Sequence, residues 1–424
     1  MKKIFNLLLF ALIITFWSCE DKTIRVYEAN SAITMSYEDW REIKPDLESE
    51  RTLENPGKIY MYKNALYINE RGMGIHVYDN SDPSNPIDKG FINIHCNLDV
   101  AVYGNTLYAG SYSDLLIFDV SNPLAPKYVA REKDVFDVTW TNIEGYDENL
   151  PVENIDLSDK VIIRWETKTV KEEIEVENSQ YNDLTWGIPE VTMAEANSAF
   201  SAGSSGGSGV GGSMASFTIQ NEHLYVLDHR ILKYSSLSNP IDLPEFEELN
   251  LFRDAETLYP YDGDLFIGTT TGMLIYDIAQ DGTPEYISSF NHWTGCDPVV
   301  VSETTAYVTL SSGCGLQRNE LHVVDISDLS NPSLIKSYEF EHPLGLGVDE
   351  NTLFLCDDDA GLKVFDVTNP ETIQENMIKH YSEINAYDVI PWNNLLIMVG
   401  DDGLYQYNYS DPNNIVELSK IEVK

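Results

Sequence analysis

The stretch Asp99–Val129, DVAVYGNTLYAGSYSDLLIFDVSNPLAPKYV, decides the fold. With the residue that follows, it divides into four short segments rich in β-branched and aromatic residues: DVAVYG, TLYAGSY, DLLIFDV and PKYVA. Turn-forming residues separate these segments, at Gly104-Asn105, Ser113-Asp114 and Ser121-Asn122-Pro123. The pattern predicts a four-stranded antiparallel sheet. Because one such unit cannot bury both of its faces, it needs copies of itself as neighbours.

Copies of this unit recur along the chain at a nearly constant spacing, apart from one longer step. An apolar pair opens the second segment of each copy, and the steps between successive pairs are 41, 117, 41, 41, 47 and 43 residues. A period near 40 with four strands per unit is typical of a propeller blade. We therefore predict an all-β fold, a seven-bladed β-propeller of four-stranded antiparallel blades. The pairs are Leu66-Tyr67, Leu107-Tyr108, Leu224-Tyr225, Leu265-Phe266, Ala306-Tyr307, Leu353-Phe354 and Leu396-Ile397.

The third segments have a common ending, as in LIFDVSNP (116–123), LHVVDISDLSNP (321–332) and LKVFDVTNP (362–370). An Asp at this point bonds the backbone N–H groups ahead of it, and Pro cannot continue a paired strand, so the ending predicts a turn. These segments resemble the LVIVD repeat family over residues 57–132 and 215–424. The resemblance implies a β-propeller in exported proteins of no agreed activity, so it indicates fold far more than function.

The repeats set the domain boundaries. The blades are predicted at about residues 57–94, 95–132, 215–250, 251–291, 292–341, 342–381 and 382–424. An insertion at 133–214 holds a β-hairpin-like piece, KVIIRWETKTVKEEIEVE, and a flexible Ser/Gly tract at 201–213. Long loops in compact domains are often functional, which favours a recognition arm. One or two degenerate blades within the insertion are the alternative.

The N-terminus is typical of an export signal. Lys2-Lys3 precedes an apolar run, and the run ends at Ser18-Cys19. Residues 1–18 resemble a bacterial lipoprotein signal peptide of the Bacteroidetes type, which implies lipidation at Cys19 and a place at the outer membrane or cell surface. A plain secretory leader is the alternative. Residues 19–56 are then a linker that packs on the first repeat, although TIRVYEA (23–29) would also suit an added strand in the closing blade.

The chain is strongly acidic, with 27 basic and 69 acidic residues and a net charge of -42. Such a charge repels phosphate backbones, so nucleic acid is excluded as a direct partner, and membrane contact is expected only through the lipid anchor. Basic proteins, cationic glycans and divalent cations are electrostatically permitted. The acidity alternatively serves solubility alone.

Four cysteines remain after Cys19. Cys296 and Cys314 fall in two loops on the same face of the fifth blade, so we predict a disulfide between them. Cys96 and Cys356 belong to different blades and are predicted to be free and buried, with their pairing left open.

Loops from outer to inner strands and from second to third strands share one propeller face, around the mouth of the central channel. Candidate side chains at this mouth are Asp99, Asp297, Asp388, His95, His292, His342, Arg71 and Arg230. Hard carboxylate oxygens would suit Ca²⁺, and the candidate ligands are Asp99, Asp297, Asp388, Asp357, Asp358 and Asp401. The favoured alternative is that these carboxylates accept N–H groups of neighbouring blades and need no cofactor.

The sequence favours a non-catalytic binding scaffold for protein or glycan, acting through the channel-mouth loops and the insertion. No G-x-S-x-G, Rossmann or P-loop signature accompanies the required strand–helix context. Two alternatives stay open: a Ca²⁺-dependent propeller hydrolase or lyase with carboxylates at the mouth, and a structural subunit of an outer-membrane assembly.

Overall fold

The computed structural model describes residues 22–97, 99–138, 143–153, 156–175, 210–211, 213–292, 295, 298–311 and 318–424. The chain forms two compact units. The smaller unit comprises residues 1–41 and 140–193, and the larger unit comprises residues 42–139 and 194–424. In the described residues no helix is long and apolar enough to cross a membrane.

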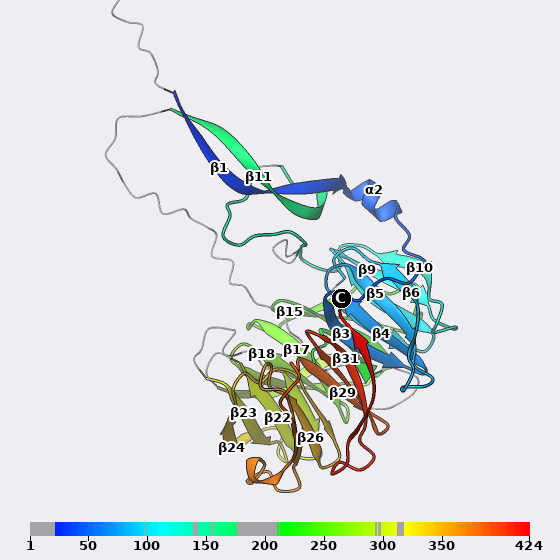
Figure 1. Ribbon diagram of the computed structural model, residues 1–424, viewed down its shortest axis with the longest axis vertical. Helices are drawn as coiled ribbons and strands as arrows, with labels where there is room; N and C mark the ends of the chain where they lie inside the picture. Colours follow the sequence, from blue (N-terminus) through cyan, green and yellow to red (C-terminus); the bar gives the residue numbers. More distant parts are fainter. Residues whose placement is uncertain are drawn as a thin grey trace, which may run out of the picture. The chain divides into compact units, whose positions relative to one another are not determined.

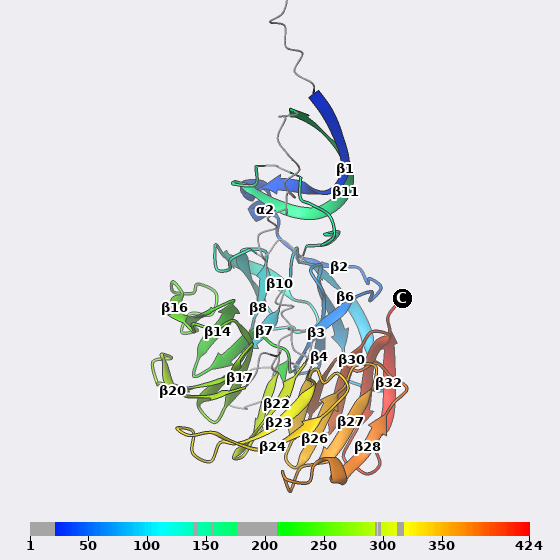
Figure 2. The same cartoon turned by 90° about the vertical axis from the view of Figure 1, so that its left-hand side faces the viewer.

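The larger unit is a ring of seven antiparallel sheets (Figures 1 and 2), which confirms the predicted all-β propeller. Each blade uses four strands that follow one another in the chain, from the axis outward. Blades 1 to 3 are β3 (Pro56–Tyr62), β4 (Ala65–Glu70), β5 (Gly74–Asp79) and β6 (Ile87–Asn93); β7 (Val100–Tyr103), β8 (Thr106–Ser111), β9 (Asp114–Asp119) and β10 (Lys127–Glu132); and β13 (Phe217–Gln220), β14 (His223–Asp228), β15 (Ile231–Ser236) and β16 (Glu247–Asn250).

The remaining four blades follow the same order. They are β17 (Ala255–Tyr261), β18 (Asp264–Thr269), β19 (Gly272–Ile278) and β20 (Pro284–Asn291); β21 (Val299–Ser302), β22 (Thr305–Leu310), β23 (Glu320–Asp325) and β24 (Ser333–Glu339); β25 (Leu346–Asp349), β26 (Thr352–Cys356), β27 (Leu362–Asp366) and β28 (Met377–Tyr381); and β29 (Asp388–Trp392), β30 (Leu395–Gly400), β31 (Gly403–Asn408) and β32 (Val416–Glu422). A 3₁₀ turn, η4 (Gln374–Asn376), precedes β28.

The core lies between the blades, because the second and third strands of each sheet are covered on both faces. Every residue of β4 and β8 is buried, whereas the outer strand β32 is mostly exposed. The apolar pairs that define the repeat lie in this buried layer, and Tyr67, Tyr108 and Tyr225 are fully buried. Burial on both faces explains why these strands read as continuous apolar runs.

A hydroxyl group links each blade to the turn of the next. In blades 1 to 3 the donor is the tyrosine of the apolar pair, and in blades 4 to 7 it is a Ser or Tyr of the outer strand. The acceptor is a backbone carbonyl in or beside the turn that follows the third strand of the next blade. The bonds are Tyr67–Pro123 (2.8 Å), Tyr108–Pro240 (2.8 Å), Tyr225–Gly282 (2.6 Å), Ser288–Leu329, Tyr338–Pro370 (2.9 Å), Tyr381–Ile415 (3.5 Å) and Ser419–Pro83 (2.6 Å).

The ring closes between blades 7 and 1 through side chains. The buried amides of Asn80 and Gln406 bond each other reciprocally, each bond being 2.8 Å long. Blade 7 consists entirely of C-terminal strands. The segment TIRVYEA adds no strand to this blade, because it lies in β1 (Lys22–Ser36), which pairs with β11 (Lys160–Glu175). Closure therefore relies on packing, on these amide contacts and on the Ser419–Pro83 bond.

The turns after the third strands behave as their residue types predict. The carboxylates of Asp79, Asp119, Asp325 and Asp366 each accept the backbone N–H two residues ahead. Blade 4 departs from this rule, because the backbone N–H of Ala279 donates to the Thr283 carbonyl (3.1 Å). Its Asp277 pairs across the sheet with Asp264, and burial together with this neighbouring charge raises the pKa of Asp264 to about 6.

The smaller unit is built on a two-stranded ribbon of β1 and β11. The predicted hairpin is wrong in its pairing, because residues 160–175 form the single strand β11. The buried Asn30 holds a nearby loop by donating to the carbonyls of Asp147 (2.7 Å) and Leu150 (2.9 Å). The helix α2 (Tyr37–Glu42) follows β1, and β2 (Leu47–Glu48) then pairs with β6 at the outer edge of blade 1.

The inter-blade hydroxyl bonds are testable with Tyr108→Phe, which leaves the Pro240 carbonyl without its donor. We expect the free energy of unfolding to fall by about 1–2 kcal/mol, because a polar group next to the core loses its partner. Chemical denaturation measures this change. Tyr286→Phe is the control, since this ring is 59% exposed, and it should change stability by less than about 0.5 kcal/mol. Equal stability of Tyr108→Phe and wild type would contradict the assigned role.

Candidate functional site

The end of the insertion passes through the centre of the propeller. The strand β12 (Val210–Gly211) pairs with β3, the innermost strand of blade 1. Residues 213–217, which we call the axial segment, then bond to four further blades. Ser213 contacts blades 6 and 7, the Ala215 carbonyl accepts from Leu258 of blade 4, and Ser216 contacts blade 2. The chain's own backbone therefore occupies the axis around which the channel-mouth residues were predicted.

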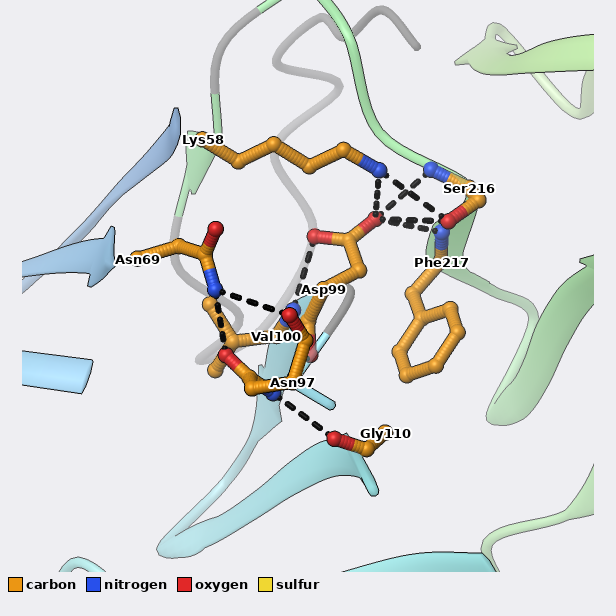
Figure 3. Close-up of polar contacts among 8 residues, drawn as sticks. All are labelled: Lys58, Asn69, Asn97, Asp99, Val100, Gly110, Ser216 and Phe217. Carbon is orange, nitrogen blue, oxygen red and sulfur yellow. Dashed lines mark hydrogen bonds and ion pairs between the residues drawn. The ribbon is translucent and has the colours of Figure 1, made fainter. Parts of the chain in front are cut away.

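Asp99 fixes one end of the axial segment (Figure 3). One carboxylate oxygen accepts the backbone N–H groups of Ser216 (2.6 Å) and Phe217 (3.0 Å), and the other accepts the N–H of Val100 (2.7 Å). Lys58 of blade 1 approaches the first oxygen at 3.2 Å. Asp99 thus ties blades 1 and 2 to the strand that opens blade 3.

The Lys58–Asp99 ion pair is largely removed from water, with 15% of the lysine side chain and 3% of the aspartate side chain exposed. Burial lowers the pKa of Lys58, and the Asp99 charge opposes this shift. A buried carboxylate needs such a partner, because an isolated charge in the protein interior is costly. Next to this pair, Asn69 donates to the Asn97 side chain (2.6 Å), which donates in turn to the Gly110 carbonyl (2.8 Å).

Asp388 of blade 7 fixes the other end of the axial segment. Its Oδ1 accepts from the backbone N–H of Ser213 (2.9 Å), the hydroxyl of Ser213 (2.7 Å) and the N–H of Val389 (2.9 Å). Its Oδ2 is buried without a hydrogen-bond partner. Burial outweighs the hydrogen bonds and raises the pKa of Asp388 to about 7. Asp99 and Asp388 therefore hold the same segment, but only Asp99 has a contacting cation.

The sequence is adapted to this close packing at Gly345. A Cβ at this position would lie 2.4 Å from Asp388 Oδ1 and 2.8 Å from Ser213 Oγ. Both contacts are shorter than real Cβ atoms tolerate. Glycine is required here because the backbone that leads into blade 6 passes close to the hydrogen bond between Ser213 and Asp388.

A second set of buried charges, which we call clamp pairs, joins the acid at the end of a second strand to a cation in the third strand. Glu70 meets His76 (2.9 Å), Asp228 meets Lys233 (2.8 Å), and Asp357 meets Lys363. Each acid also accepts a backbone N–H from the loop that enters its blade, at Asn55, Asp137 and His342. Asp357, a candidate metal ligand from the sequence, is therefore engaged in a clamp pair.

The other candidate residues contact side chains of the same blade or of a neighbouring blade. Arg71 lies over the Tyr387 ring at 4.5 Å, and Arg230 makes two 2.7 Å bonds to Asp254. His95 stacks on Tyr112, and His342 bonds Asp358 at 2.6 Å. The backbone N–H of Asp401 donates to the Asn385 side chain, which also contacts Asp358. His292 lies beside His322, and the centroids of the two imidazole rings are 5.7 Å apart.

Several candidates lie outside the described residues: Cys19, Cys296, Asp297 and Cys314. Their lipidation, disulfide and ligand roles stay predictions. Cys96 and Cys356 are buried free thiols. Within the part of the chain that is described, no three His, Cys, Asp or Glu side chains gather as a metal-binding group.

The clamp pairs are the feature that sequence reasoning missed. The signal was present, because His76, Lys233 and Lys363 each stand between two apolar residues, three positions before the end of a third strand. A charge at a fixed position of a buried strand indicates a buried partner. Asp357 instead stands among the candidate Ca²⁺ ligands that the sequence predicts at the mouth.

Comparison with known proteins identifies the repeat. The family model described as LVIVD repeat matches residues 98–132 and 297–339, which correspond to blades 2 and 5. The chain is therefore a seven-bladed β-propeller that contains LVIVD repeats. No curated protein matches it.

Solved structures share the fold at low sequence identity. A functionally unknown protein from Desulfotomaculum acetoxidans has a TM-score of 0.51 and 11% identity, covering 87% of this chain and 95% of that one. A protein from Lactobacillus plantarum has a TM-score of 0.51 and 10% identity, covering 87% and 96%. The computationally designed Ika8 protein has a TM-score of 0.50 and 9% identity, covering 89% and 90%. These likenesses concern the fold alone.

The raised pKa of Asp388 predicts a pH-dependent stability. The native state keeps this proton to about pH 7, whereas an unfolded aspartate loses it near about pH 4. Between these values the native state binds more protons, so the contribution of Asp388 to stability falls as the pH rises. Asp388→Asn keeps an oxygen acceptor for Ser213 and cannot ionise. We expect the unfolding temperature of wild type, relative to this variant, to fall between about pH 5 and pH 8.

Asp79→Asn is the matched control for this experiment. Hydrogen bonds from Ser81 lower the pKa of Asp79, so it remains ionised throughout this pH range in both states. Its difference from wild type should therefore stay constant. A constant difference for Asp388→Asn as well would contradict the assignment of a titrating carboxyl group to the axis.

Proposed function

We propose that this protein is an exported, lipid-anchored binding scaffold that holds a protein or glycan ligand without chemical turnover. The observation that carries this proposal is the axial segment. It occupies the axis of the propeller and engages two of the candidate mouth carboxylates, Asp99 and Asp388, in structural hydrogen bonds. Ligand contact then falls to the loops around the occupied axis.

The loops between second and third strands, and those that lead from an outer strand into the next blade, supply polar groups held in fixed positions. The Arg230 guanidinium is 61% exposed while two bonds to Asp254 orient it. His342 is 38% exposed and is oriented by Asp358. Rigid, partly exposed side chains lose little conformational entropy on binding, which favours recognition.

Export and anchoring rest on the N-terminal sequence. Lys2-Lys3, the apolar run and Ser18-Cys19 resemble a lipoprotein signal, and a net charge of -42 suits a protein that is exposed to solvent. A single lipid-modified N-terminus would be the membrane attachment, while the acidic body would stay clear of anionic lipid.

The binding proposal is tested by screening the fluorescently tagged chain, produced without residues 1–19, on a printed glycan array and on an array of purified surface and secreted proteins. We expect saturable binding to at least one probe. Arg230→Ala with His342→Ala should weaken it at least tenfold, because both groups belong to the mouth-side loops. Mass spectrometry of the bound probe should show no change after prolonged incubation.

Asp82→Ala with Asp411→Ala provides the matched control. These carboxylates cap turns after third strands, at the opposite end of the blades from the mouth loops. This variant should bind like wild type. Cleavage of the probe would replace the scaffold with the hydrolase or lyase alternative. Binding that is lost only in the control variant would contradict a mouth-side site.

The anchor is tested separately with Cys19→Ala. In cells fed an alkyne fatty acid, the wild-type chain should become labelled and partition into the detergent phase of Triton X-114. The variant should lose the label and remain in the aqueous phase. Equal labelling of the two proteins would contradict lipidation at Cys19 without bearing on ligand binding.

A further inference from the structure

Blade 5 contains a buried histidine with an unused ring nitrogen. His322 lies on β23, and 9% of its side chain is exposed. Its Nε2 lies 2.8 Å from a carboxylate oxygen of Glu320. Because a carboxylate only accepts, Nε2 carries the hydrogen in the neutral ring, and Nδ1 is left as a lone pair. This Nδ1 is buried and has no hydrogen-bond partner.

A second imidazole lies against the first. His292 directly follows β20 of blade 4, and its ring centroid is 5.7 Å from that of His322, with the ring planes at 88°. Phe290 packs beside both rings, at 6.3 and 6.1 Å. The two imidazoles therefore meet at the boundary between blades 4 and 5, in a largely apolar setting.

The same position in other blades has a different neighbourhood. His76 of blade 1 also bonds a carboxylate, but its ring packs on Phe91 at 4.8 Å. Lys233 and Lys363 occupy the position in blades 3 and 6 and form ion pairs there. A clamp pair explains a single cation beside an acid, but it gives no reason for a second imidazole.

The protonation state suits metal binding. Burial lowers the pKa of His322, and the neighbouring His292 lowers it further, against the raising effect of Glu320. Arg318, 3.5 Å from Glu320, also disfavours a second positive charge. Metal binding requires the neutral ring, which this lowering of the pKa favours. A carboxylate on the far nitrogen is the usual partner that orients a metal-binding histidine.

We propose that His322, through Nδ1, and His292 bind a divalent transition-metal ion of the Zn²⁺ class between blades 4 and 5. Glu320 acts as a positioning residue that fixes the tautomer and orientation of His322. Imidazole nitrogen favours Zn²⁺ over Ca²⁺ and Mg²⁺, which prefer oxygen ligands. A metal held by two blades would also stabilise their contact, because it binds only the folded ring.

The test is calorimetric titration of the chelator-treated full chain with ZnCl₂ at about pH 7.5, together with thermal unfolding at each zinc concentration. We expect saturable binding of one ion and a higher unfolding temperature with zinc. CaCl₂ should produce neither effect. His322→Ala and His292→Ala should each weaken zinc binding at least tenfold, and Glu320→Gln should weaken it by about tenfold.

His292→Ala leaves the Glu320–His322 pair intact, so it reports on metal binding even if His322→Ala folds poorly. His380→Ala is the matched control, because this exposed histidine bonds the Ala360 carbonyl and should leave zinc affinity unchanged. Absence of saturable zinc binding to the wild type would overturn the proposal. Wild-type affinity in both His292→Ala and His322→Ala would overturn it too, since the zinc would then be bound elsewhere.

Discussion

A hydroxyl group of each blade donates to a main-chain carbonyl at the turn of the following blade, from Tyr67 and Pro123 around to Ser419 and Pro83. The acceptor lies where the third strand has ended, so its carbonyl has no place in a sheet ladder and would otherwise depend on water. Each bond is worth only about 1 kcal/mol, and apolar packing between blades supplies most of the stability. The bonds are directional, unlike the apolar contacts. A blade that is displaced along its neighbour keeps apolar contacts, but its hydroxyl group loses the carbonyl acceptor. The two sequence signals that recur with the repeat, the apolar–tyrosine pair and the Asn-Pro turn, are thus partners in space in the first blades.

The propeller axis poses a different constraint, because the first strands converge there with unpaired inner edges. In this chain the end of the insertion supplies partners for these edges. The strand β12 pairs with one inner edge, and Ser213 and Ser216 bond the carboxylates of two other blades. The arrangement explains how Asp99 and Asp388 are tolerated almost without water. Asp99 lies beside Lys58, whereas Asp388 has no cation in contact, and burial raises the pKa of Asp388 although its hydrogen bonds and the charge of Lys58 oppose the shift. The carboxylates and the segment need each other, since neither would be satisfied at the axis alone.

The sequence was sufficient for the ring and insufficient for its centre. Seven blades could be predicted because strand period, turn residues and burial all repeat with the same spacing, so each copy supported the others. The pairing of β1 with β11 could not be predicted, because the two strands lie more than a hundred residues apart and neither belongs to the repeat. For the same reason the Ser/Gly tract was read as flexible up to Ser213, although its end is a strand and a bonded segment. The composition of such a tract indicates only its local flexibility. The position of its end is determined by distant groups: the unpaired edge of β3 and the buried carboxylates of Asp99 and Asp388.

The clamp position shows how a repeat fold leaves room for chemistry. Three residues before the end of the third strand, the blades carry histidine, lysine or an apolar residue, on a backbone that barely changes. A lysine there has only N–H groups to donate, and Lys233 and Lys363 each pair with the acid that holds the entering loop. A histidine bonded to a carboxylate through Nε2 still has Nδ1 available as a metal ligand, so its role depends on which side chain the neighbouring blade places beside it. In blade 1 the ring of His76 packs on Phe91, whereas in blade 5 the ring of His322 lies beside a second imidazole, that of His292. Function in such a ring is therefore sought where one copy's neighbour departs from the others, because the shared features are already accounted for by the fold.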